Sequence, residues 1–202
     1  MDISGKTVLV TGASSGIGAA IAQAMAKAGA EVLLLARGEE ELAKVAAEIV
    51  SGGGKARIYK VDLTDAKAVA AVIKRINKEI GTPDILVNNA GSGQWKYLED
   101  TSVAEIQQMM AMPYFAAATL IRAFLPGMLA RNSGHIVNVS SVASRFVWPG
   151  ATAYTAARWA LRGLTEALRA DLYGTGIGVT LFESGEVASP YWEHNPGSQE
   201  RI

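Results

Sequence analysis

Short, almost continuous apolar runs alternate along the chain with longer segments whose apolar residues recur every three or four positions. The short runs are bounded by Gly, Pro or polar residues, which is typical of buried strands, and the longer segments show the period of amphipathic helices. The pattern predicts strands at residues 7–10, 32–36, 56–61, 84–88, 135–140 and 177–182. It predicts helices at residues 17–27, 39–50, 66–80, 103–131 and 152–173.

The predicted strands are apolar at successive positions rather than at alternate ones, which indicates burial on both faces of a sheet. Strands that alternate with helices in this way form a mostly parallel sheet covered by helices. Right-handed crossovers then give a doubly wound α/β fold. We see no internal linker, so we expect residues 1–202 to form a single domain. Residues 184–202 are polar, contain Pro and Gly, and receive no assignment.

Composition narrows the classes of function. The 202 residues are 50% hydrophobic and 19% charged, with 19 basic and 19 acidic side chains and so a formal net charge of zero. This balance gives no reason to expect nucleic acid or an anionic membrane as a partner. The absence of cysteine excludes disulfides and zinc–cysteine sites, and no cluster of histidines and carboxylates suggests a metal. Because there is neither a signal pattern nor an apolar stretch long enough to span a bilayer, we expect a cytoplasmic protein.

Three glycines, Gly12, Gly16 and Gly18, lie between the first predicted strand and the first predicted helix. A sharp strand-to-helix turn needs residues that can adopt positive φ, which glycine does without steric cost. A pyrophosphate also needs close approach to backbone N–H groups at a helix N-terminus. The motif therefore predicts a nucleotide-binding loop, although a glycine triplet taken alone is also compatible with an ordinary loop.

The chain resembles the short-chain dehydrogenase/reductase family in four motifs, which occur in this order: Thr11-Gly-Ala-Ser-Ser-Gly-Ile-Gly18, Asn88-Asn-Ala-Gly91, the pair Ser140 and Ser141, and Tyr154 followed four residues later by the basic Arg158. The resemblance extends over nearly the whole chain. It implies the strand order 3-2-1-4-5-6, in which the loops after the first, fourth and fifth strands meet at the carboxyl edge of the sheet and bind the ligand. It also implies a seventh strand and a final helix, which we would expect after Ile202.

The end of the second predicted strand points to the choice of dinucleotide. An acid there would bond the ribose 2′-hydroxyl of NAD, whereas an arginine can pair with the 2′-phosphate of NADP. In this chain Arg37 follows Ala36, and no acid occurs before Glu39. We therefore expect NADP(H) rather than NAD(H); the alternative is that Arg37 is a solvated loop charge.

The resemblance implies further residues that contact the dinucleotide. They are Gly12, Ser14, Ser15, Gly16, Ile17 and Gly18 in the glycine loop, Asp62 and Leu63 after the third strand, Asn88, Ala90 and Gly91 after the fourth, then Tyr154 and Arg158, and finally Val187 and Ser189. Two alternatives stay open. Asp62 could instead cap the following helix, a role that Thr64 could also take, and residues 88–91 could form a simple turn.

The resemblance implies a reaction centre of Ser141, Tyr154 and Arg158. Hydride transfer to a carbonyl leaves an alkoxide, which needs a proton and a hydrogen bond to its oxygen. Tyr154 and Arg158 share one face of a helix because they are four residues apart, and Ser141 precedes Tyr154 by 13 residues, as is usual in the family. In these roles Ser141 orients the substrate, Tyr154 is the acid/base, and the Arg158 cation stabilises the tyrosinate.

Two positions depart from the family pattern. The family has lysine where this chain has Arg158, and arginine keeps the charge but does not deprotonate, so it cannot relay protons. An arginine here could also swing into solvent. The catalytic asparagine of the family falls at Pro113, inside the predicted helix 103–131. We expect this proline to kink the helix and free the carbonyl of Met109 to hold a relay water; the alternative is that the relay is absent.

These observations leave two functions to weigh. The first is an NADP(H)-dependent oxidoreductase that acts on a small-molecule carbonyl or alcohol, with Tyr154 as acid/base. The second is a nucleotide-binding member of the family with weak or no catalysis, because of Arg158 and Pro113. His135, at the start of a predicted strand, is interpreted as a packed or edge histidine rather than a catalyst, and His194 has no visible partner.

Aromatic residues flank the expected site. Trp95, Tyr97 and Trp148 would either line an apolar substrate pocket or pack in the core. The identity of the substrate cannot be read from these residues. The resemblance also predicts a homodimer or homotetramer, since members of the family associate through the faces of the two long helices, here residues 103–131 and 152–173.

Overall fold

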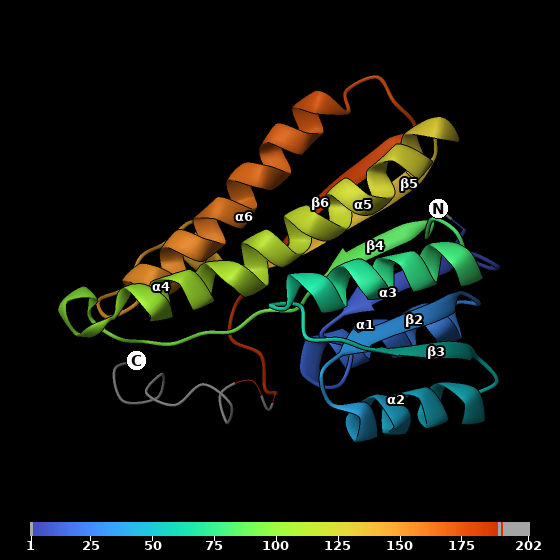
Figure 1. Cartoon of the computed structure of the whole chain (residues 1–202), viewed down its shortest axis with the longest axis horizontal. Coiled ribbons are helices and arrows are strands. Elements are labelled where there is room, and N and C mark those ends of the chain that lie inside the picture. The colour runs from blue at the N-terminus through green and yellow to red at the C-terminus, as the bar shows by residue number, and fades with distance from the viewer. Residues whose placement is uncertain (1, 190, 192–202) are drawn as a thin grey trace.

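A computed structural model describes residues 2–189 and 191 of the chain, and His194 lies outside this range. Six parallel strands form one sheet in the order β3-β2-β1-β4-β5-β6 (Figure 1). The strands are β1 (Thr7–Thr11), β2 (Glu31–Ala36), β3 (Lys55–Lys60), β4 (Ile85–Asn88), β5 (Gly134–Ser141) and β6 (Ile177–Ser184). The predicted doubly wound fold and its strand order are therefore confirmed.

Helices connect successive strands, as the periodicity predicted. They are α1 (Gly16–Lys27), α2 (Glu39–Ser51), α3 (Ala66–Glu79), α4 (Val103–Met110), α5 (Ala116–Ala130) and α6 (Thr152–Asp171). The Ser102–Glu105 capping box at the start of α4 is present. The N-cap of α3 is Asp65, whose carboxylate accepts hydrogen bonds from the backbone of Lys67 and Ala68. The suggestion that Asp62 or Thr64 caps this helix is wrong.

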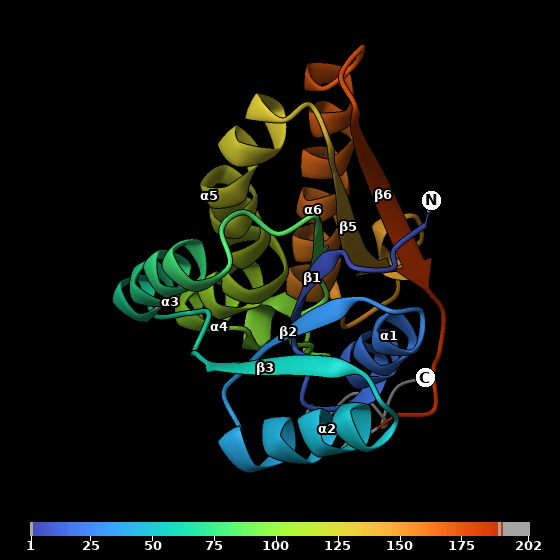
Figure 2. The same ribbon diagram turned by 90° about the vertical axis from the view of Figure 1, so that its right-hand side faces the viewer.

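The helices cover both faces of the sheet (Figure 2). In β1, Val8 and Val10 pack into the core shared with α1 and α2, whereas Leu9 points to the other face and packs into the core shared with α3, α5 and α6. Because side chains alternate along a strand, continuous apolar runs fill both cores at once. This is the physical reason for the sequence pattern, and it leaves the loops at the strand ends as the place for polar chemistry.

The predicted helix 103–131 is broken in its middle. Residues Ala111–Phe115, which include Pro113, form a π-helical turn between α4 and α5. Proline has no N–H to donate, and a turn with wider spacing accommodates that loss within a continuous helix. At the end of this turn, the backbone N–H of Ala116 bonds the carbonyl of Ala111. The disturbance expected at Pro113 therefore takes the form of a local widening of the helix.

Residues Val103–Ala130 are, by length and composition alone, long and apolar enough to cross a membrane. This differs from the expectation that no such stretch exists. Leu120, Phe124 and Met128 are fully buried in the core beneath the sheet. Core helices of soluble proteins can pass the same test of length and composition.

Candidate active site

A cavity of about 1090 Å³ lies at the carboxyl edge of the sheet, where the parallel strands deliver their loops. Most of the residues predicted from the resemblance line it: Gly12, Ser14, Ser15, Gly16, Ile17, Arg37, Leu63, Ala90, Gly91, Ser141, Tyr154, Arg158, Val187 and Ser189. Gly18, Asp62 and Asn88 were predicted as well but are not part of the lining. The fold thus brings together residues that are far apart in the sequence.

The glycine loop is built for close approach of a ligand to the backbone. Gly12 and Gly16 have φ values of +63° and +52°, which favour glycine. Gly18 has a different role, since a Cβ there would collide with the carbonyl of Gly12, and so glycine lets α1 pack on the strand. No side chain caps the N-terminus of α1, whose N-cap residue Ser15 lines the cavity. The free N–H groups of this turn form a site for an anion.

Thr11 fixes the loop after β4 against the glycine loop. Its hydroxyl accepts hydrogen bonds from the backbone N–H groups of Asn89 and Ala90, at 2.9 and 3.0 Å. The Asn89 amide in turn donates to the carbonyl of Thr11 at 3.0 Å. These bonds join two loops separated by almost 80 positions and shape one wall of the cavity. Asn89 lines the cavity although the resemblance singled out its neighbours.

Asn88 lies just behind this wall. Its amide donates to Asn138 at 2.8 Å, and Asn138 donates to the hydroxyl of Thr165 at 2.9 Å. Thr165 then donates to the carbonyl of Leu161 at 2.7 Å. All four residues are buried, so this hydrogen-bonded chain ties β4, β5 and α6 together. In this structure Asn88 therefore positions the site from outside the cavity.

The far end of the cavity carries charges of both signs. Arg37, at the end of β2, is exposed, and residues 2–189 offer it no ion-pair partner within 4.0 Å. Glu41, in the first turn of α2, also lines the cavity and was not predicted. Asp62 accepts two hydrogen bonds from Thr64. These bonds, together with the charge of Arg37, hold the pKa of Asp62 below its usual range despite partial burial.

Tyr154 and Arg158 occupy the first two turns of α6 and are both buried. The Arg158 guanidinium carbon lies 5.0 Å from the centroid of the Tyr154 ring. Its Nη1 donates to the carbonyl of Val139 at 3.4 Å, and a Cβ on Gly91 would come within 2.7 Å of its Nη2. The alternative that Arg158 swings into solvent is therefore wrong. Its side chain reaches the cavity wall between β5 and the loop after β4.

The protonation of Arg158 is secure although the group is buried. Burial acts to lower the pKa of Arg158, but the neighbouring Tyr154 and Tyr191 side chains outweigh it and raise the pKa above its usual value. Its Nε has no hydrogen-bond partner among the described residues. A permanent, partly unsatisfied cation thus faces Tyr154 in a low-dielectric setting, where it stabilises a negative charge strongly.

Ser141 ends β5 and starts a short 3₁₀ turn, Val142–Ser144. The Ser141 hydroxyl oxygen accepts a hydrogen bond from the backbone N–H of Ala143 at 3.2 Å. Its own proton stays available for an acceptor in the cavity. The Ser140 hydroxyl also lines the cavity, is buried and has no partner among the described residues; the resemblance pointed to the Ser–Ser pair but assigned a role only to its second member.

An aromatic wall closes one side of the cavity next to Tyr154. The Trp95 ring lies 6.2 Å from that of Trp148 and 6.5 Å from that of Tyr154, centroid to centroid. Phe146 extends the wall outward, 6.5 Å from Trp148. Of the three aromatic residues that the sequence offered, Trp95 and Trp148 line the cavity, whereas Tyr97 does not.

Met112 and Tyr191 also line the cavity, and no sequence pattern pointed to either of them. Met112 enters the cavity from the π-helical turn beside Pro113, so the departure from the family pattern places a flexible apolar side chain there. Tyr191 lies close to Gly93 and Arg158. Ser189 lies over Gly16, where a Cβ would come within 3.3 Å of the serine Cβ. The resemblance predicted that Val187 and Ser189 contact the dinucleotide, and both line the cavity.

The two other predictions about chemistry concern histidine and metals. His135 is half-buried in β5, and its Nε2 lies 2.8 Å from the Thr180 hydroxyl on β6; burial lowers its pKa. It lies outside the cavity lining. Within the described part of the chain, no group of three or more His, Asp or Glu side chains is arranged to hold a metal ion.

Residues 6–199 match the family model for short chain dehydrogenase. An uncharacterized oxidoreductase of Mycobacterium tuberculosis is 40% identical over 193 residues, which cover 93% of this chain and 57% of that protein. The chain thus spans little more than half the length of this relative.

Solved structures give the same picture. A metagenomic short-chain oxidoreductase in complex with NADP is 40% identical, with a TM-score of 0.88 over 93% of this chain and 86% of that one. A short chain dehydrogenase/reductase from Burkholderia phymatum in complex with NAD is 29% identical, with a TM-score of 0.91 over 96% of this chain and 70% of that one. Proteins with this architecture therefore bind either dinucleotide.

Proposed function

This chain belongs to the short-chain dehydrogenase family, and from that premise we propose that it is an NADP(H)-dependent oxidoreductase that interconverts an apolar carbonyl compound and its alcohol. The observation that carries the proposal is the placement of Tyr154 against the buried Arg158 cation, in the same cavity as Ser141 and the glycine loop. These residues supply a proton donor, a charge that stabilises its anion and a hydrogen-bond donor for the substrate oxygen.

The features of the cavity itself fit a dinucleotide. Free N–H groups at the start of α1 suit the pyrophosphate, and the glycines around them leave room for close approach. Ser92 and Ser140 line the cavity, and their buried hydroxyls lack partners among the described residues. A bound polar ligand would satisfy them, and leaving such groups unpaired costs roughly 1–3 kcal/mol each.

Arg37 supports NADP(H) as the preferred dinucleotide. It lines the cavity at the end of β2 and makes no ion pair with the described residues that would compete for its guanidinium. A guanidinium can pair with a phosphate through two hydrogen bonds. Glu41 opposes this preference, because its carboxylate lines the same region and repels a phosphate. We propose that the two hydrogen bonds from Arg37 to the phosphate outweigh the repulsion by Glu41.

The protein's residues would act as follows in the reductive direction. When bound, the nicotinamide of NADPH supplies the hydride that the carbonyl carbon receives. The Tyr154 hydroxyl gives its proton to the carbonyl oxygen, and Ser141 donates a hydrogen bond to the same oxygen, so an alcohol is formed. Arg158 stabilises the tyrosinate that remains until a solvent proton replaces the one transferred. Oxidation of an alcohol runs through the same groups in reverse.

The lining next to Tyr154 indicates the class of substrate. Trp95, Trp148 and Met112 present apolar surface there, beside the Arg158 cation, whereas Arg37 and Glu41 lie at the other end of the cavity. Apolar walls with a few polar groups are typical of sites for small apolar molecules. We therefore propose a neutral aromatic or alkyl aldehyde or ketone, and its alcohol, as the substrate pair.

One observation favours a second candidate, a nucleotide-binding protein with weak or no catalysis. Arg158 stays protonated, and Pro113 stands where the family's asparagine would be, so two parts of the family's proton relay are missing. A site of this kind could bind the dinucleotide and still return protons to Tyr154 too slowly for efficient turnover.

Turnover and binding, measured together, decide between the candidates. The purified chain would be given NADPH with benzaldehyde, acetophenone, decanal or glyceraldehyde, and oxidation of NADPH followed by absorbance. We expect turnover with the first three, and a loss of about 10²- to 10⁴-fold in Tyr154→Phe. NADPH binding, followed by energy transfer from tryptophan, should be unchanged in this variant. Binding without turnover of any carbonyl supports the second candidate, and absence of binding contradicts both.

A further inference from the structure

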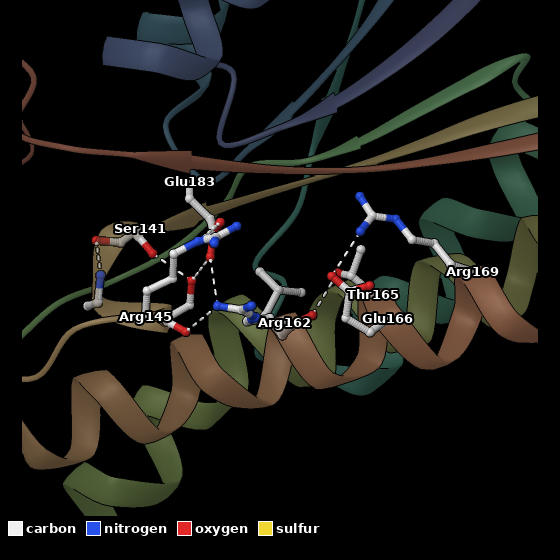
Figure 3. A network of polar contacts seen from close by, with 10 residues as sticks. Ser141, Arg145, Arg162, Thr165, Glu166, Arg169 and Glu183 are labelled. Carbon is white, nitrogen blue, oxygen red and sulfur yellow. Dashed lines mark hydrogen bonds and ion pairs between the residues drawn. The ribbon is translucent and has the colours of Figure 1, made fainter.

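Behind Ser141 lies a buried carboxylate that no step of the proposed reaction uses. We propose that Glu183 is a positioning residue for Ser141: through Ser144, Arg145 and Arg162 it fixes the turn after β5, and with it the direction of the Ser141 hydroxyl (Figure 3). This inference rests on the proposed function, since it assumes that the hydroxyl contacts the substrate oxygen.

Glu183 lies on β6 directly beside Ser140 of β5, one position before the pair Ser184 and Ser141. Its side chain is 10% exposed, and the turn Val142–Ser144 lies close to its carboxylate. A carboxylate buried to this degree is costly unless its oxygens are hydrogen-bonded. The groups that bond it show what the carboxylate holds in place.

The first of these groups is the Ser144 hydroxyl, which contacts two acceptors at once. It makes a short hydrogen bond to Glu183 Oε1, and its oxygen also lies 2.7 Å from the carbonyl oxygen of Ser141. A hydroxyl has one proton, so the two acceptors share it, and the charged carboxylate is the stronger of them. Ser144 therefore links the carboxylate directly to the backbone of Ser141.

Two arginines complete the network from opposite sides. Arg145 Nε, at the end of the turn, lies 2.5 Å from Glu183 Oε2. Arg162 Nη1, on α6, donates to the carbonyl of Ser144 at 3.1 Å and lies 3.6 Å from Glu183 Oε1. The turn is thereby tied to β6 and to the helix that carries Tyr154. Figure 3 shows that these contacts converge on the carboxylate while Ser141 lies at the edge of the network.

The carboxylate keeps its charge under ordinary conditions. Burial acts to raise the pKa of Glu183, but its hydrogen bonds with Ser144 and Arg145 outweigh burial and hold the pKa below its usual range. The network is therefore fully formed at neutral pH.

The turn Val142–Ser144 sets the rotamer of the Ser141 side chain. The backbone N–H of Ala143 donates to the Ser141 hydroxyl oxygen at 3.2 Å, so this oxygen is an acceptor toward the turn and its proton is directed elsewhere. If the turn moves, the Ala143 N–H no longer fixes the hydroxyl. Displacements of about 1 Å in a positioned group can cost on the order of 100-fold in rate. Loss of Glu183 is thus expected to lower kcat through Ser141.

The test is a double-mutant cycle on NADPH-dependent reduction of benzaldehyde by the full chain. We expect Glu183→Ala to lower kcat roughly 10- to 100-fold with the KM for NADPH within about twofold of wild type. In a Ser141→Ala background the same substitution should have almost no further effect, because a residue that acts through Ser141 has nothing left to position. Additive losses, or a wild-type kcat in Glu183→Ala, overturn the proposal.

Matched variants separate positioning from general stability. Glu183→Gln keeps groups that can bond Ser144 and Arg145, so it should recover most of the lost kcat. Glu166→Ala removes the exposed pair with Arg169 elsewhere on α6 and should change nothing; an equal loss in this control points to a stability effect and contradicts the inference. Arg145→Ala, at a half-exposed position, is the milder probe should Glu183→Ala not fold, and a wild-type kcat in both Arg145→Ala and Glu183→Gln then contradicts the inference.

A readout independent of turnover distinguishes failure of this inference from failure of the proposed function. Hydrogen exchange of the amides of Ala143, Arg145 and Phe146 should be faster in Glu183→Ala than in wild type and in Glu166→Ala. Unchanged exchange contradicts the positioning role even if activity falls. Faster exchange, with Ser141→Ala fully active, shows instead that the turn is held as inferred but that the role proposed for Ser141 is wrong.

Discussion

The Arg158 guanidinium carbon lies 5.0 Å from the centroid of the Tyr154 ring, and the ion pairs of the described residues include none to Arg158. Replacement of a buried cation by an apolar side chain of similar volume is often neutral or stabilising, so the fold itself does not require the charge of Arg158. Such a charge is retained where it serves another purpose. Here the group that it faces is the tyrosine proposed as acid/base.

Replacing this cation should therefore change stability and activity in opposite directions. Arg158→Met fills a similar volume without charge, so we expect the melting temperature to stay the same or rise by about 2–4 °C per kcal/mol gained. Turnover of benzaldehyde should fall on the order of 100-fold as the tyrosinate loses its cation. Calorimetry and steady-state kinetics on the same preparation check both expectations.

Arg158→Lys is the matched variant, since lysine keeps the charge and adds a proton that can be lost. It should retain more activity than Arg158→Met at every pH. A loss of stability together with activity in Arg158→Met would contradict the interpretation, because it would mean that the guanidinium holds the fold rather than the chemistry.

Arg37→Ala tests the choice of dinucleotide. Removing a charged pair of hydrogen bonds to the 2′-phosphate costs about 1.5–3 kcal/mol, or roughly 10- to 150-fold in affinity. We expect this loss for NADPH, with NADH affinity changed by less than about twofold, as measured by energy transfer from tryptophan. Glu41→Gln is the counterpart and should strengthen NADPH binding. Equal effects of Arg37→Ala on both dinucleotides contradict the assignment.

Glu105 makes the loop that carries Trp95 sensitive to acid. Its carboxylate accepts hydrogen bonds from Lys96 at 2.9 Å and from the backbone and hydroxyl of Ser102 at 2.7 Å each, and these lower its pKa from 4.5 to about 2. Because the folded-state pKa is the lower one, the stabilisation is complete above the unfolded-state value and is lost as pH falls toward about 2.

The measurement is the melting temperature of wild type and Glu105→Gln as a function of pH. The wild type should melt at the higher temperature at neutral pH, and the difference should shrink as pH falls below about 4.5. A difference that stays constant down to the lowest pH at which the chain folds would show that the Glu105 carboxylate makes no titratable contribution.

Exposed apolar side chains on α4, on the π-helical turn Ala111–Phe115 and on α6 motivate a prediction about assembly. Val103, Phe115 and Trp159 are 71%, 57% and 48% exposed. Large exposed apolar side chains are common at protein interfaces. We expect a homodimer or homotetramer by light scattering, and a shift toward monomer in Phe115→Asp. A monomeric wild type contradicts this prediction.

Much of this protein could be predicted from its sequence for local reasons. Continuous apolar strands and amphipathic helices give the sheet and its layers, since burial on two faces requires that pattern. The glycine loop could also be predicted from the sequence, because positive φ at Gly12 and Gly16 restricts which residues can occupy these positions.

Tertiary structure decided whatever depends on residues far apart in the chain. Asn88 turns to Asn138, 50 positions away, rather than into the cavity. The sequence left Arg158 free to face solvent or the site, and only packing against Gly91 and Val139 placed it inside. The direction of a long side chain is set by which partners the fold brings within reach.

The clearest case is Glu183, an acid that directly follows the predicted strand 177–182 and has no motif around it. Its proposed role depends on the parallel register of β5 and β6, which places it beside Ser140. It depends also on the side chains of the turn and of α6 that contact its carboxylate. The sequence by itself determined the fold and the kind of ligand, because short-range patterns encode burial and backbone freedom. The fold decided which charges meet around Ser141 and Tyr154, because electrostatic contacts depend on distance in space.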